Sequence, residues 1–348
     1  MADFDIAEFE PKTASRDEWS AFHRYNHARH AEIRPDDPEN PEDVEEKYMN
    51  FEDPQRFRRR LAVWDDGEIV GFFGVSGHRE GGPGYDTNKH LLNLNGAVLE
   101  PYRRRGLGTS ILGKVSEMMD EYGRTVLSVG TEEQDGHAFL LRIGAEERFK
   151  GAENRLDLTK VDWEMVQRWA AQGKERSPAS ELVLYEDRLP DDVLEKYTPV
   201  ITAVLNTVPF EELDHGDIVI TPEMVKEWNR QMDAVGDSHH TYVTIEPDGD
   251  YSAMTDVFYS PHQPTYVWQG FTGVKPEYRG RGMGRWIKAA MLLYLRGRYE
   301  GLRWVVTDNA HSNSWMLAIN EELGFSRYKA GSTYQISKEV LDKYLANV

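Results

Sequence analysis

The fold of this 348-residue chain is decided by two stretches of sequence, Arg103-Arg104-Arg105-Gly106-Leu107-Gly108 and Arg279-Gly280-Arg281-Gly282-Met283-Gly284. Both have the pattern Arg-x-x-Gly-x-Gly. Each follows an apolar run that ends in a valine, Val98 in one case and Val274 in the other, and each is followed by a helical pattern. A repeat at about half the length of the chain indicates a duplicated domain, because solenoid repeats have far shorter periods.

The repeated motif has the chemistry of an anion-binding turn. A strand that enters a glycine-containing turn and then a helix leaves several backbone N–H groups unpaired, and the helix dipole adds positive potential there. Glycine also lets the backbone approach a phosphate closely. One copy would be weak support, since Arg-Gly turns occur in ordinary loops, but two copies in the same context favour a nucleotide or phosphate ligand. Neither copy has the Gly-x-Gly-x-x-Gly spacing of a Rossmann fold.

The composition narrows the class of protein. The chain has 60 Asp and Glu against 41 Lys and Arg, a net charge of −19, so we expect no nucleic-acid partner and an attraction for cations. It has no cysteine, which excludes disulfides, thiolate metal ligands and a cysteine nucleophile. No apolar run reaches roughly 18 residues, and the acidic N-terminus, Met1-Ala2-Asp3-Phe4-Asp5, has no signal pattern. We therefore expect a cytoplasmic protein with no membrane partner.

The order of the elements predicts a mixed α/β sheet in each half of the chain. In the first half we expect helices at 16–32 and 41–51, strands at 60–64, 69–76 and 91–98, a helix from the motif to 121, a strand at 125–129, a helix at 136–143 and a final hairpin ending at 158. In the second half we expect strands at 182–186, 241–246, 251–259, 266–274 and 303–307, with helices at 191–205, 222–232 and 282–299. A helix at 161–172 and a polar stretch at 173–180 would form the linker.

With these motifs the chain resembles the GCN5-related N-acetyltransferase (GNAT) superfamily, in the tandem, mycothiol-synthase-like arrangement. The second half strengthens the resemblance, because Asn313 precedes a helical segment that closes with Leu323-Gly324-Phe325. The resemblance implies an α/β (α+β mixed sheet) fold, with two tandem GNAT-type acyl-CoA N-acyltransferase domains related by pseudo-two-fold duplication. We predict these domains at residues 1–172 and 173–348.

The resemblance also implies a cofactor and the residues that hold it. Acetyl-CoA would be the acyl donor, and no metal is implied. In the second domain the cofactor-binding residues would be Val274, Arg279, Gly280, Arg281, Gly282, Met283, Gly284, Arg285, Asn309 and Asn313. In the first domain they would be Val98, Arg103, Arg104, Arg105, Gly106, Leu107, Gly108 and Thr109. Lys288 also follows the second motif and is a candidate for phosphate contact.

The two halves differ where the cofactor site would be completed. When Gly144 is aligned with Gly324, the first half has Glu133 in place of Asn313, and Ile143-Gly144-Ala145 in place of the Leu-Gly-Phe segment. A carboxylate near a polyphosphate costs electrostatic energy, whereas an amide does not. We therefore predict that the second domain is the catalytic one and that the first is a degenerate copy.

The mechanism that the resemblance implies is direct attack of an amine on the thioester, with the N–H of Val274 polarising the carbonyl oxygen. Asp256 is the preferred base, with Glu246 and Asp308 as alternatives. Asn320 occupies the position where the family often has a tyrosine that protonates the CoA thiolate. Tyr334 and Ser312 are the candidates to replace that hydroxyl.

The acceptor is predicted only by class, as a small-molecule amine that the acidic chain favours in cationic form. A different reading is a non-catalytic protein that binds or senses acyl-CoA. His23, His27 and His30 share one face of a predicted helix, but without a fourth ligand they predict a polar wall of the first acceptor cleft and no metal site. The chain would be a monomer or a homodimer.

Overall fold

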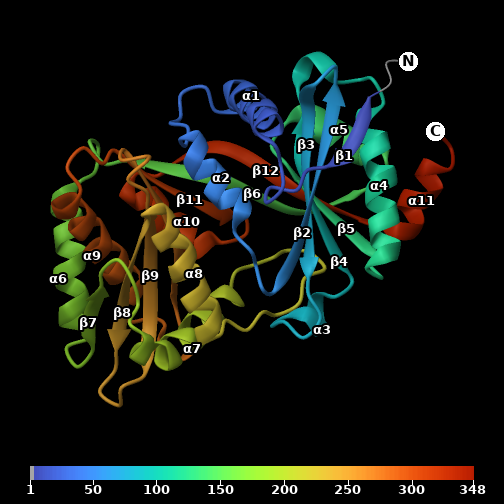
Figure 1. Cartoon of the computed structure of the whole chain (residues 1–348). Coiled ribbons are helices and arrows are strands. Elements are labelled where there is room, and N and C mark those ends of the chain that lie inside the picture. Colours follow the sequence, from blue (N-terminus) through green and yellow to red (C-terminus); the bar gives the residue numbers. More distant parts are fainter. Residues whose placement is uncertain (1–3) are drawn as a thin grey trace. The chain divides into compact units, whose positions relative to one another are not determined.

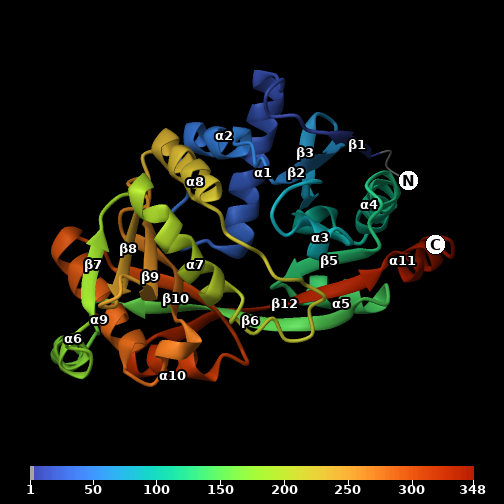
Figure 2. The ribbon, with the colours of Figure 1, turned by 90° about the horizontal axis from the view of Figure 1, so that it is seen from below.

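The structure is a computed structural model that describes residues 4–348 (Figures 1 and 2). Met1, Ala2 and Asp3, part of the acidic N-terminal stretch considered above, lie outside the described residues. The chain divides into two compact units. Unit 1 comprises Met1–Lys150, Glu211–Asp217 and Gly331–Val348, and unit 2 comprises Gly151–Phe210 and Ile218–Ala330.

Unit 1 contains five strands and six helices from its own parts of the sequence. The strands are β1 (Asp5–Glu8), β2 (Arg56–Asp65), β3 (Glu68–His78), β4 (Leu91–Val98) and β5 (Val126–Thr131), and the helices are α1 (Arg16–Ile33), α2 (Glu42–Asn50), α3 (Tyr85–Asn88), α4 (Leu107–Glu121), α5 (Gln134–Arg142) and α11 (Lys338–Leu345). Asp66 and Gly67 turn the chain between β2 and β3 with φ of 48° and 81°, a left-handed conformation that Asp and Gly tolerate best. β1 to β4 pair antiparallel in sequence order, and β4 and β5 run parallel.

The sheet of unit 1 is covered on both faces. Trp19, Phe22 and Tyr25 of α1 pack on Ala62 and Phe72 of the sheet. The other face carries a larger apolar cluster to which α4 and α11 contribute. In Figure 1 these two layers lie on opposite sides of the blue-to-teal strands. The alternation of apolar residues along β2 and β3 explains this arrangement, because successive side chains of a strand point to opposite faces.

Unit 2 repeats the same order of elements. Its strands are β7 (Glu181–Tyr185), β8 (Ser238–Ile245), β9 (Tyr251–Tyr259), β10 (Tyr266–Val274) and β11 (Trp304–Ala310), and its helices are α6 (Trp163–Arg176), α7 (Leu194–Leu205), α8 (Pro222–Val235), α9 (Met283–Arg298) and α10 (Ser314–Leu323). β7 to β10 pair antiparallel, and β10 and β11 run parallel. Helices α7 and α8 cover one face of this sheet, and α6 and α9 cover the other (Figure 2). Short 3-10 turns, η1 (Glu100–Tyr102) and η3 (Pro276–Tyr278), precede the two motifs.

Each sheet is completed by a strand from the other half of the sequence. Two long strands, β6 (Glu146–Asp157) and β12 (Ser326–Ser337), contain the boundaries between the units. Residues 332–337 of β12 pair antiparallel with β5 in unit 1, and residues 151–157 of β6 pair antiparallel with β11 in unit 2. The red arrow of β12 beside β5 is visible in both views (Figures 1 and 2). The chain therefore exchanges its final strands.

This exchange changes two predictions. The hairpin expected to end at residue 158 is instead the single strand β6. The compact units also depart from the predicted division at residues 172 and 173. Helix α6, which we expected to be a linker, packs Val166 and Trp169 into the apolar cluster of unit 2. Local patterning cannot reveal such exchange, because a strand satisfies the same alternation whichever neighbour it pairs with.

Most other elements agree with the prediction. The strands expected at 91–98 and 266–274 have those bounds, and the helices after both motifs are present. The short elements β1 and α3 and the C-terminal helix α11 were not predicted. None of the helices within residues 4–348 combines the length and apolarity that crossing a bilayer requires.

Candidate functional site

The second motif forms the turn between β10 and α9. Gly282 is the N-cap of α9 with φ of 78°, and Gly280 has φ of 83°, a conformation in which a side chain would cost energy. Arg279 folds back so that its Nε donates to the carbonyl oxygen of Val274 at 3.2 Å. The first N–H groups of α9 therefore start beside the end of β10, as an anion-binding turn requires.

The edge of β10 that faces β11 becomes unpaired before the motif. The two strands pair only over residues 266–268 and 304–306, and β10 then contains a bulge. Lys275 N–H donates to a carbonyl of β9 at 2.9 Å. Because neighbouring residues of an antiparallel strand alternate their hydrogen-bonding edges, the N–H of Val274 points to the opposite edge, which β11 has left. A ligand carbonyl at this edge would meet a backbone donor.

Asp256, the predicted base, lies in the interior of unit 2 and is 1% exposed. Its Oδ1 accepts the N–H of Phe271 at 2.6 Å, and its Oδ2 lies 3.1 Å from Nε2 of His239. Both oxygens are therefore occupied at the bulge of β10. This burial contradicts the prediction that Asp256 touches the acceptor, and the carboxylate instead holds the bulge in place. The polar neighbours that allow a carboxylate to be buried come from other strands.

Arg281 of the second motif and Arg285, just after it, have carboxylate partners. Arg281 donates to Oε2 of Glu246 at 3.0 Å and to Oγ of Ser180 at 2.7 Å. Burial raises the pKa of the Glu246 carboxyl, but hydrogen bonds from two serine hydroxyls and from Arg281 outweigh it and hold the pKa below its usual range. Glu246 thus anchors the motif loop and is not placed as a base. Arg285 pairs with Glu322 at 2.5 Å.

Two further residues near this loop differ from expectation. Lys288, proposed for phosphate contact, is buried inside unit 2. Arg176, at the end of α6, was not predicted, yet its Nη1 lies 3.1 Å from the position that a Cβ on Gly282 would take. It brings a cation to the motif turn. The sequence carried no signal for Arg176, because only the packing of α6 on α9 brings it there.

The segment after β11 contains the predicted amides. Asn313 is the N-cap of α10, and its side chain accepts the N–H of Met316 at 3.3 Å, so the prediction that an asparagine opens this helix is confirmed. Ser312 is exposed in the preceding turn. Met283 is 1% exposed and points into the core, so it can contribute only its backbone to a ligand.

A cavity of about 120 Å³ lies beside α10, with three asparagines in its wall. The Oδ1 of Asn309 accepts a hydrogen bond from Nδ2 of Asn320 at 2.7 Å and one from Nδ2 of Asn154 at 3.2 Å. Asn154 comes from β6, in the first half of the sequence, and sequence reasoning missed it. Its place beside Asn309 follows from the strand exchange.

Tyr334, a predicted proton donor for the second domain, belongs to unit 1. It pairs with Val129 of β5, and its hydroxyl lies 3.0 Å from Nδ1 of His137. It is 2% exposed, and burial raises its pKa. The prediction is wrong for the second domain, because the strand that carries Tyr334 is exchanged.

The first motif forms the matching turn in unit 1. Gly106 is the N-cap of α4 with φ of 88°, and Arg104 has φ of 63°. Arg103 repeats the fold-back, with its Nε donating to the oxygen of Val98 at 3.0 Å. The backbone of this turn therefore resembles that of the second motif.

The side chains of the first motif are also held within unit 1. Arg105 donates to the oxygen of Pro101 at 3.0 Å, and Thr109 Oγ1 lies 3.2 Å from the Tyr344 hydroxyl. Leu107 is buried, and a Cβ on Gly108 would lie 3.1 Å from the ring of Phe139.

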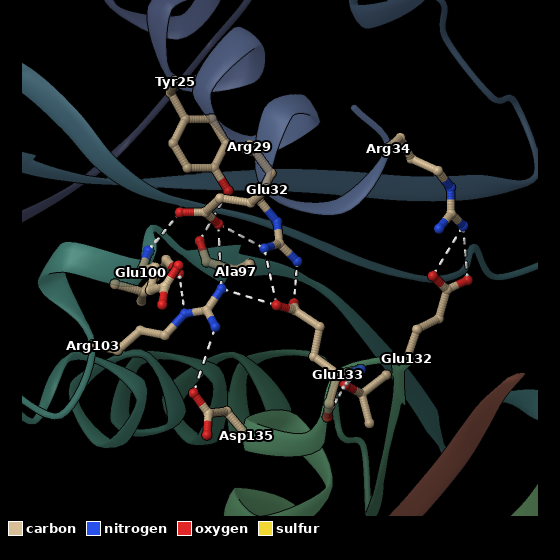
Figure 3. Close-up of polar contacts among 12 residues, drawn as sticks. Tyr25, Arg29, Glu32, Arg34, Ala97, Glu100, Arg103, Glu132, Glu133 and Asp135 are labelled. Atoms are coloured by element: carbon tan, nitrogen blue, oxygen red, sulfur yellow. Dashed lines mark hydrogen bonds and ion pairs between the residues drawn. The ribbon is translucent and has the colours of Figure 1, made fainter. Parts of the chain in front are cut away.

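Four charged side chains close the space between this turn and α5, and we call them the ion cluster: Arg29, Glu32, Arg103 and Glu133 (Figure 3). Arg29 donates to both oxygens of Glu133 and to Oε2 of Glu32, the latter at 2.9 Å. Arg103 Nη2 donates to Glu133 at 2.9 Å and to Glu32 at 3.3 Å. Glu32 also accepts the N–H of Glu100 at 2.7 Å, so the cluster is tied to η1.

The ion cluster changes what unit 1 can bind. Glu133 is the N-cap of α5, as Asn313 is of α10. Burial raises the pKa of Glu133, but hydrogen bonds and charges from Arg29 and Arg103 outweigh it, so the carboxyl is ionised well below neutrality. A polyphosphate here would meet a carboxylate, and the two arginines are already neutralised.

The histidines of α1 do not form a common surface. His23 is buried and His27 is exposed, and their nitrogens lie 3.1 Å and 2.5 Å from separate glutamates. His30 lies 2.9 Å from a backbone oxygen. Within residues 4–348, no group of three or more His, Cys, Asp or Glu side chains is arranged to hold a metal ion.

Parts of the chain are similar to the model of a protein family and to a known protein. Residues 19–145 match the model of the acetyltransferase (GNAT) family. A stretch of 97 residues is 35% identical to mycothiol acetyltransferase of Salinispora arenicola (strain CNS-205). That alignment covers 27% of this chain and 31% of the length of the relative.

Solved structures share the fold over almost the whole chain. A tandem GNAT protein from the clavulanic acid biosynthesis pathway superposes with a TM-score of 0.73 at 18% identity, covering 97% of this chain and 99% of that one. A GCN5-related N-acetyltransferase from Sphaerobacter thermophilus superposes with a TM-score of 0.64 at 15% identity, covering 96% of each chain. These likenesses establish the duplicated fold.

Proposed function

We propose that this protein is an acetyl-CoA-dependent N-acetyltransferase, because residues 19–145 match the model of the acetyltransferase (GNAT) family and the whole chain has the fold of tandem GNAT proteins. It transfers the acetyl group to the primary amine of a small acceptor, and unit 2 carries the reaction. The family match falls in the first half of the chain, so the choice of unit 2 rests on the chemistry of the two motif sites.

The observation that carries this choice is the contrast between the two sites. In unit 2 the motif turn meets an unpaired strand edge and an uncharged helix cap, Asn313. In unit 1 the corresponding cap is Glu133, and the ion cluster occupies the space. Backbone N–H groups and a helix dipole attract phosphate in both units, but only unit 2 leaves them without a competing carboxylate at the helix cap.

The reaction follows from this geometry. The amine nitrogen attacks the thioester carbonyl carbon, the C–N bond forms, and the C–S bond breaks as the sulfur leaves with the electron pair. The Val274 N–H stabilises the oxyanion. The nitrogen must lose a proton, and we assign Asp308 as the group that takes it. Asp308 is exposed on β11, just beyond the residues that pair with β10. Asp308 and Asn309 point to opposite faces of β11, so the amine substrate and the asparagine amides of α10 lie on different sides of that strand.

The chemical class of the acetyl acceptor is inferred from the net charge of the chain. The chain carries a net charge of −19, and such a field concentrates cationic molecules around the protein. We therefore propose a small acceptor that carries at least one cationic amine besides the one acetylated.

A second candidate function is a non-catalytic acyl-CoA-binding protein. The burial of Asp256 and the engagement of Glu246 with Arg281 favour it, because they remove two of the three predicted bases. It shares the cofactor site with the first proposal and differs only in the absence of transfer.

Calorimetric titration with acetyl-CoA, followed by assay of thiol release with a panel of amines, separates the two. We expect one bound equivalent and release of thiol with cationic amines. Binding without thiol release for any amine would favour the sensor, and absence of binding would refute both proposals.

Replacing Glu133 with asparagine is expected to open unit 1 to acetyl-CoA. The substitution places the residue of unit 2 at the cap of α5 and leaves Arg29 and Arg103 with one carboxylate fewer, so the negative charge that opposes a polyphosphate there is reduced. The number of acetyl-CoA equivalents bound in a calorimetric titration should rise from one to two. Glu132→Gln, which removes the carboxylate of the adjacent residue that pairs with Arg34, is the matched control and should stay at one. Two equivalents in the unaltered protein would contradict the closed first site.

A further inference from the structure

Lys288 is a buried amine without a carboxylate partner. It lies on α9 and is 1% exposed. Its Nζ donates to Oδ1 of Asn320, lies 3.6 Å from Sδ of Met316, and is 5.0 Å from the centre of the Phe325 ring. The groups that face it from α10 and from the turn just before β12 are thus an amide, a thioether and a ring. Within residues 4–348 no carboxylate pairs with it, and burial alone lowers its pKa to about 7.

The duplication supplies an internal comparison for this lysine. Counted from the N-cap glycines of α4 and α9, the residue of unit 1 that corresponds to Lys288 is Leu112. Counted from the N-caps of α5 and α10, the residue that corresponds to Asn320 is Leu140. Both leucines are buried in one apolar cluster. The fold therefore tolerates a pair of apolar side chains at this position. A lone buried lysine lowers the stability of the folded protein, whereas a buried leucine does not.

The position of Lys288 connects it to the cofactor turn. Gly284 precedes it by four residues, so both lie on the same face of α9, about 6 Å apart along the helix. A Cβ on Gly284 would lie 3.7 Å from Ile319 of α10 and 4.0 Å from Val274 of β10. The inner face of α9 thus leads from the phosphate-binding turn, past the oxyanion donor, to Lys288 and Asn320.

We propose that Lys288 and Asn320 together form a preorganised hydrogen-bond donor for the sulfur of CoA. Lys288 is the positioning residue: it binds Oδ1 of Asn320 and thereby directs the amide nitrogen away from itself. One hydrogen of that nitrogen goes to Asn309. Among the described residues the nitrogen donates that one hydrogen bond, and Asn320 lines the cavity beside α10, so its second hydrogen can serve a ligand there. This inference rests on the proposed function, because it takes acyl-CoA to bind at the second motif.

The chemistry of the step explains why such a donor is useful. When the C–S bond breaks, the sulfur gains a negative charge, and a hydrogen bond to a charged acceptor is roughly twice as strong as a neutral one. Asn320 donates without giving up a proton. The thiolate needs no immediate proton, since a thiol has a pKa near 8.5. The proton that it finally takes balances the one lost by the amine.

Lys288→Met tests the proposal, with Leu112→Met at the matching position of unit 1 as the control. We expect Lys288→Met to remain folded, to melt at a higher temperature, and to lose about 100-fold in kcat, the loss typical of removing one charge-stabilising donor. Leu112→Met should change neither quantity appreciably, because volume-conserving apolar changes are tolerated. A lower melting temperature with unchanged kcat would mark Lys288 as merely structural.

Binding of CoA compared with desulfo-CoA tests the sulfur contact without any turnover. Above about pH 9, where CoA is mostly the thiolate, the unaltered protein should prefer CoA roughly tenfold, the increment of a hydrogen bond to a charged group, and Lys288→Met should lose that preference. Transfer activity without the preference would refute the Lys288 inference and keep the proposed function. A preference for CoA over desulfo-CoA without any acetyl transfer would keep the Lys288 inference and refute the proposed function. If Lys288→Met does not fold, Lys288→Leu with Asn320→Leu copies the pair of unit 1 and serves instead.

The pH dependence of stability gives a further expected result. Above pH 7 the folded protein releases the proton of Lys288, whereas the unfolded chain keeps it up to about 10.5. The unfolded state then binds more protons, so the stability of the unaltered protein rises with pH across this window. Lys288→Met lacks that gain, and its advantage in melting temperature should shrink between pH 7 and pH 9. An advantage that does not depend on pH would contradict a charged, buried Lys288.

Discussion

Two polypeptides made by dividing the chain between Pro178 and Ala179 are each expected to be unfolded alone and to fold when they are produced together. The division falls in an exposed turn between α6 and β7, so it removes no buried contact by itself. Its effect comes from the strand exchange. The first half would lack residues 211–217 and 331–348 of unit 1, and the second half would lack residues 151–178 of unit 2.

The size of the effect follows from what the exchanged segments bury. Tyr334, Ile336 and Leu341 are buried in the apolar cluster of unit 1, and each such side chain contributes about 1.5–3 kcal/mol. Their sum is comparable to the whole stability of a domain, about 5–15 kcal/mol. In addition, β5 would keep only its short parallel pairing with β4. Neither half can therefore form a complete sheet.

Circular dichroism of the separate and co-expressed halves measures whether they fold, and size-exclusion chromatography measures whether they associate. A chain cut by a protease at an engineered site after Pro178 is the control, and it should remain folded and associated. Two halves that fold independently as monomers would show that the exchanged strands are dispensable.

Gly282→Val is expected to abolish acetyl-CoA binding by unit 2 and to lower kcat/KM by at least about 100-fold, the loss that a displacement of about 1 Å can cause. Gly282 has φ of 78°, where a side chain costs about 1–2 kcal/mol. Its Cβ would also lie 3.1 Å from Nη1 of Arg176. The turn must shift, and the first N–H groups of α9 shift with it.

Gly106→Val is the matched control, because Gly106 has φ of 88° and no atom within 4 Å of an added Cβ. It imposes the same kind of strain on unit 1 and should lower the melting temperature by a similar amount while leaving acetyl transfer unchanged. Calorimetry and thiol-release assays on both variants measure the contrast. Loss of transfer in Gly106→Val with retention in Gly282→Val would reverse the assignment of the catalytic unit.

Local patterns predicted the elements of the fold well. The two apolar runs before the motifs became β4 and β10 with the expected bounds, because alternation and a following glycine turn are properties of the strand itself. The short strand β1 and the helices α3 and α11 were missed. They are brief or polar, and their formation depends on the units against which they pack.

The candidate site was predicted in part. The glycines at 106, 280 and 282 adopt the left-handed conformation, and Asn313 caps a helix. The side chains beyond the backbone were harder to predict. Asp256 and Glu246 hold β10 and the motif turn, and Lys288 lies inside the unit, because a charged residue is buried only where distant partners or a functional demand allow it.

The amino-acid sequence by itself determined that the chain is a duplication, that each half holds the same strand–turn–helix motif, and that Glu133 distinguishes the first copy from the second. These are properties of residues close together in the chain, where backbone conformation and hydrophobic period act. The tertiary structure alone decided that β6 and β12 are exchanged, that Tyr334 serves unit 1, that Asn154 lies beside Asn309, and that Lys288 meets Asn320. Pairing between distant strands depends on the surface that they bury together, and no local pattern records which partner a strand will choose.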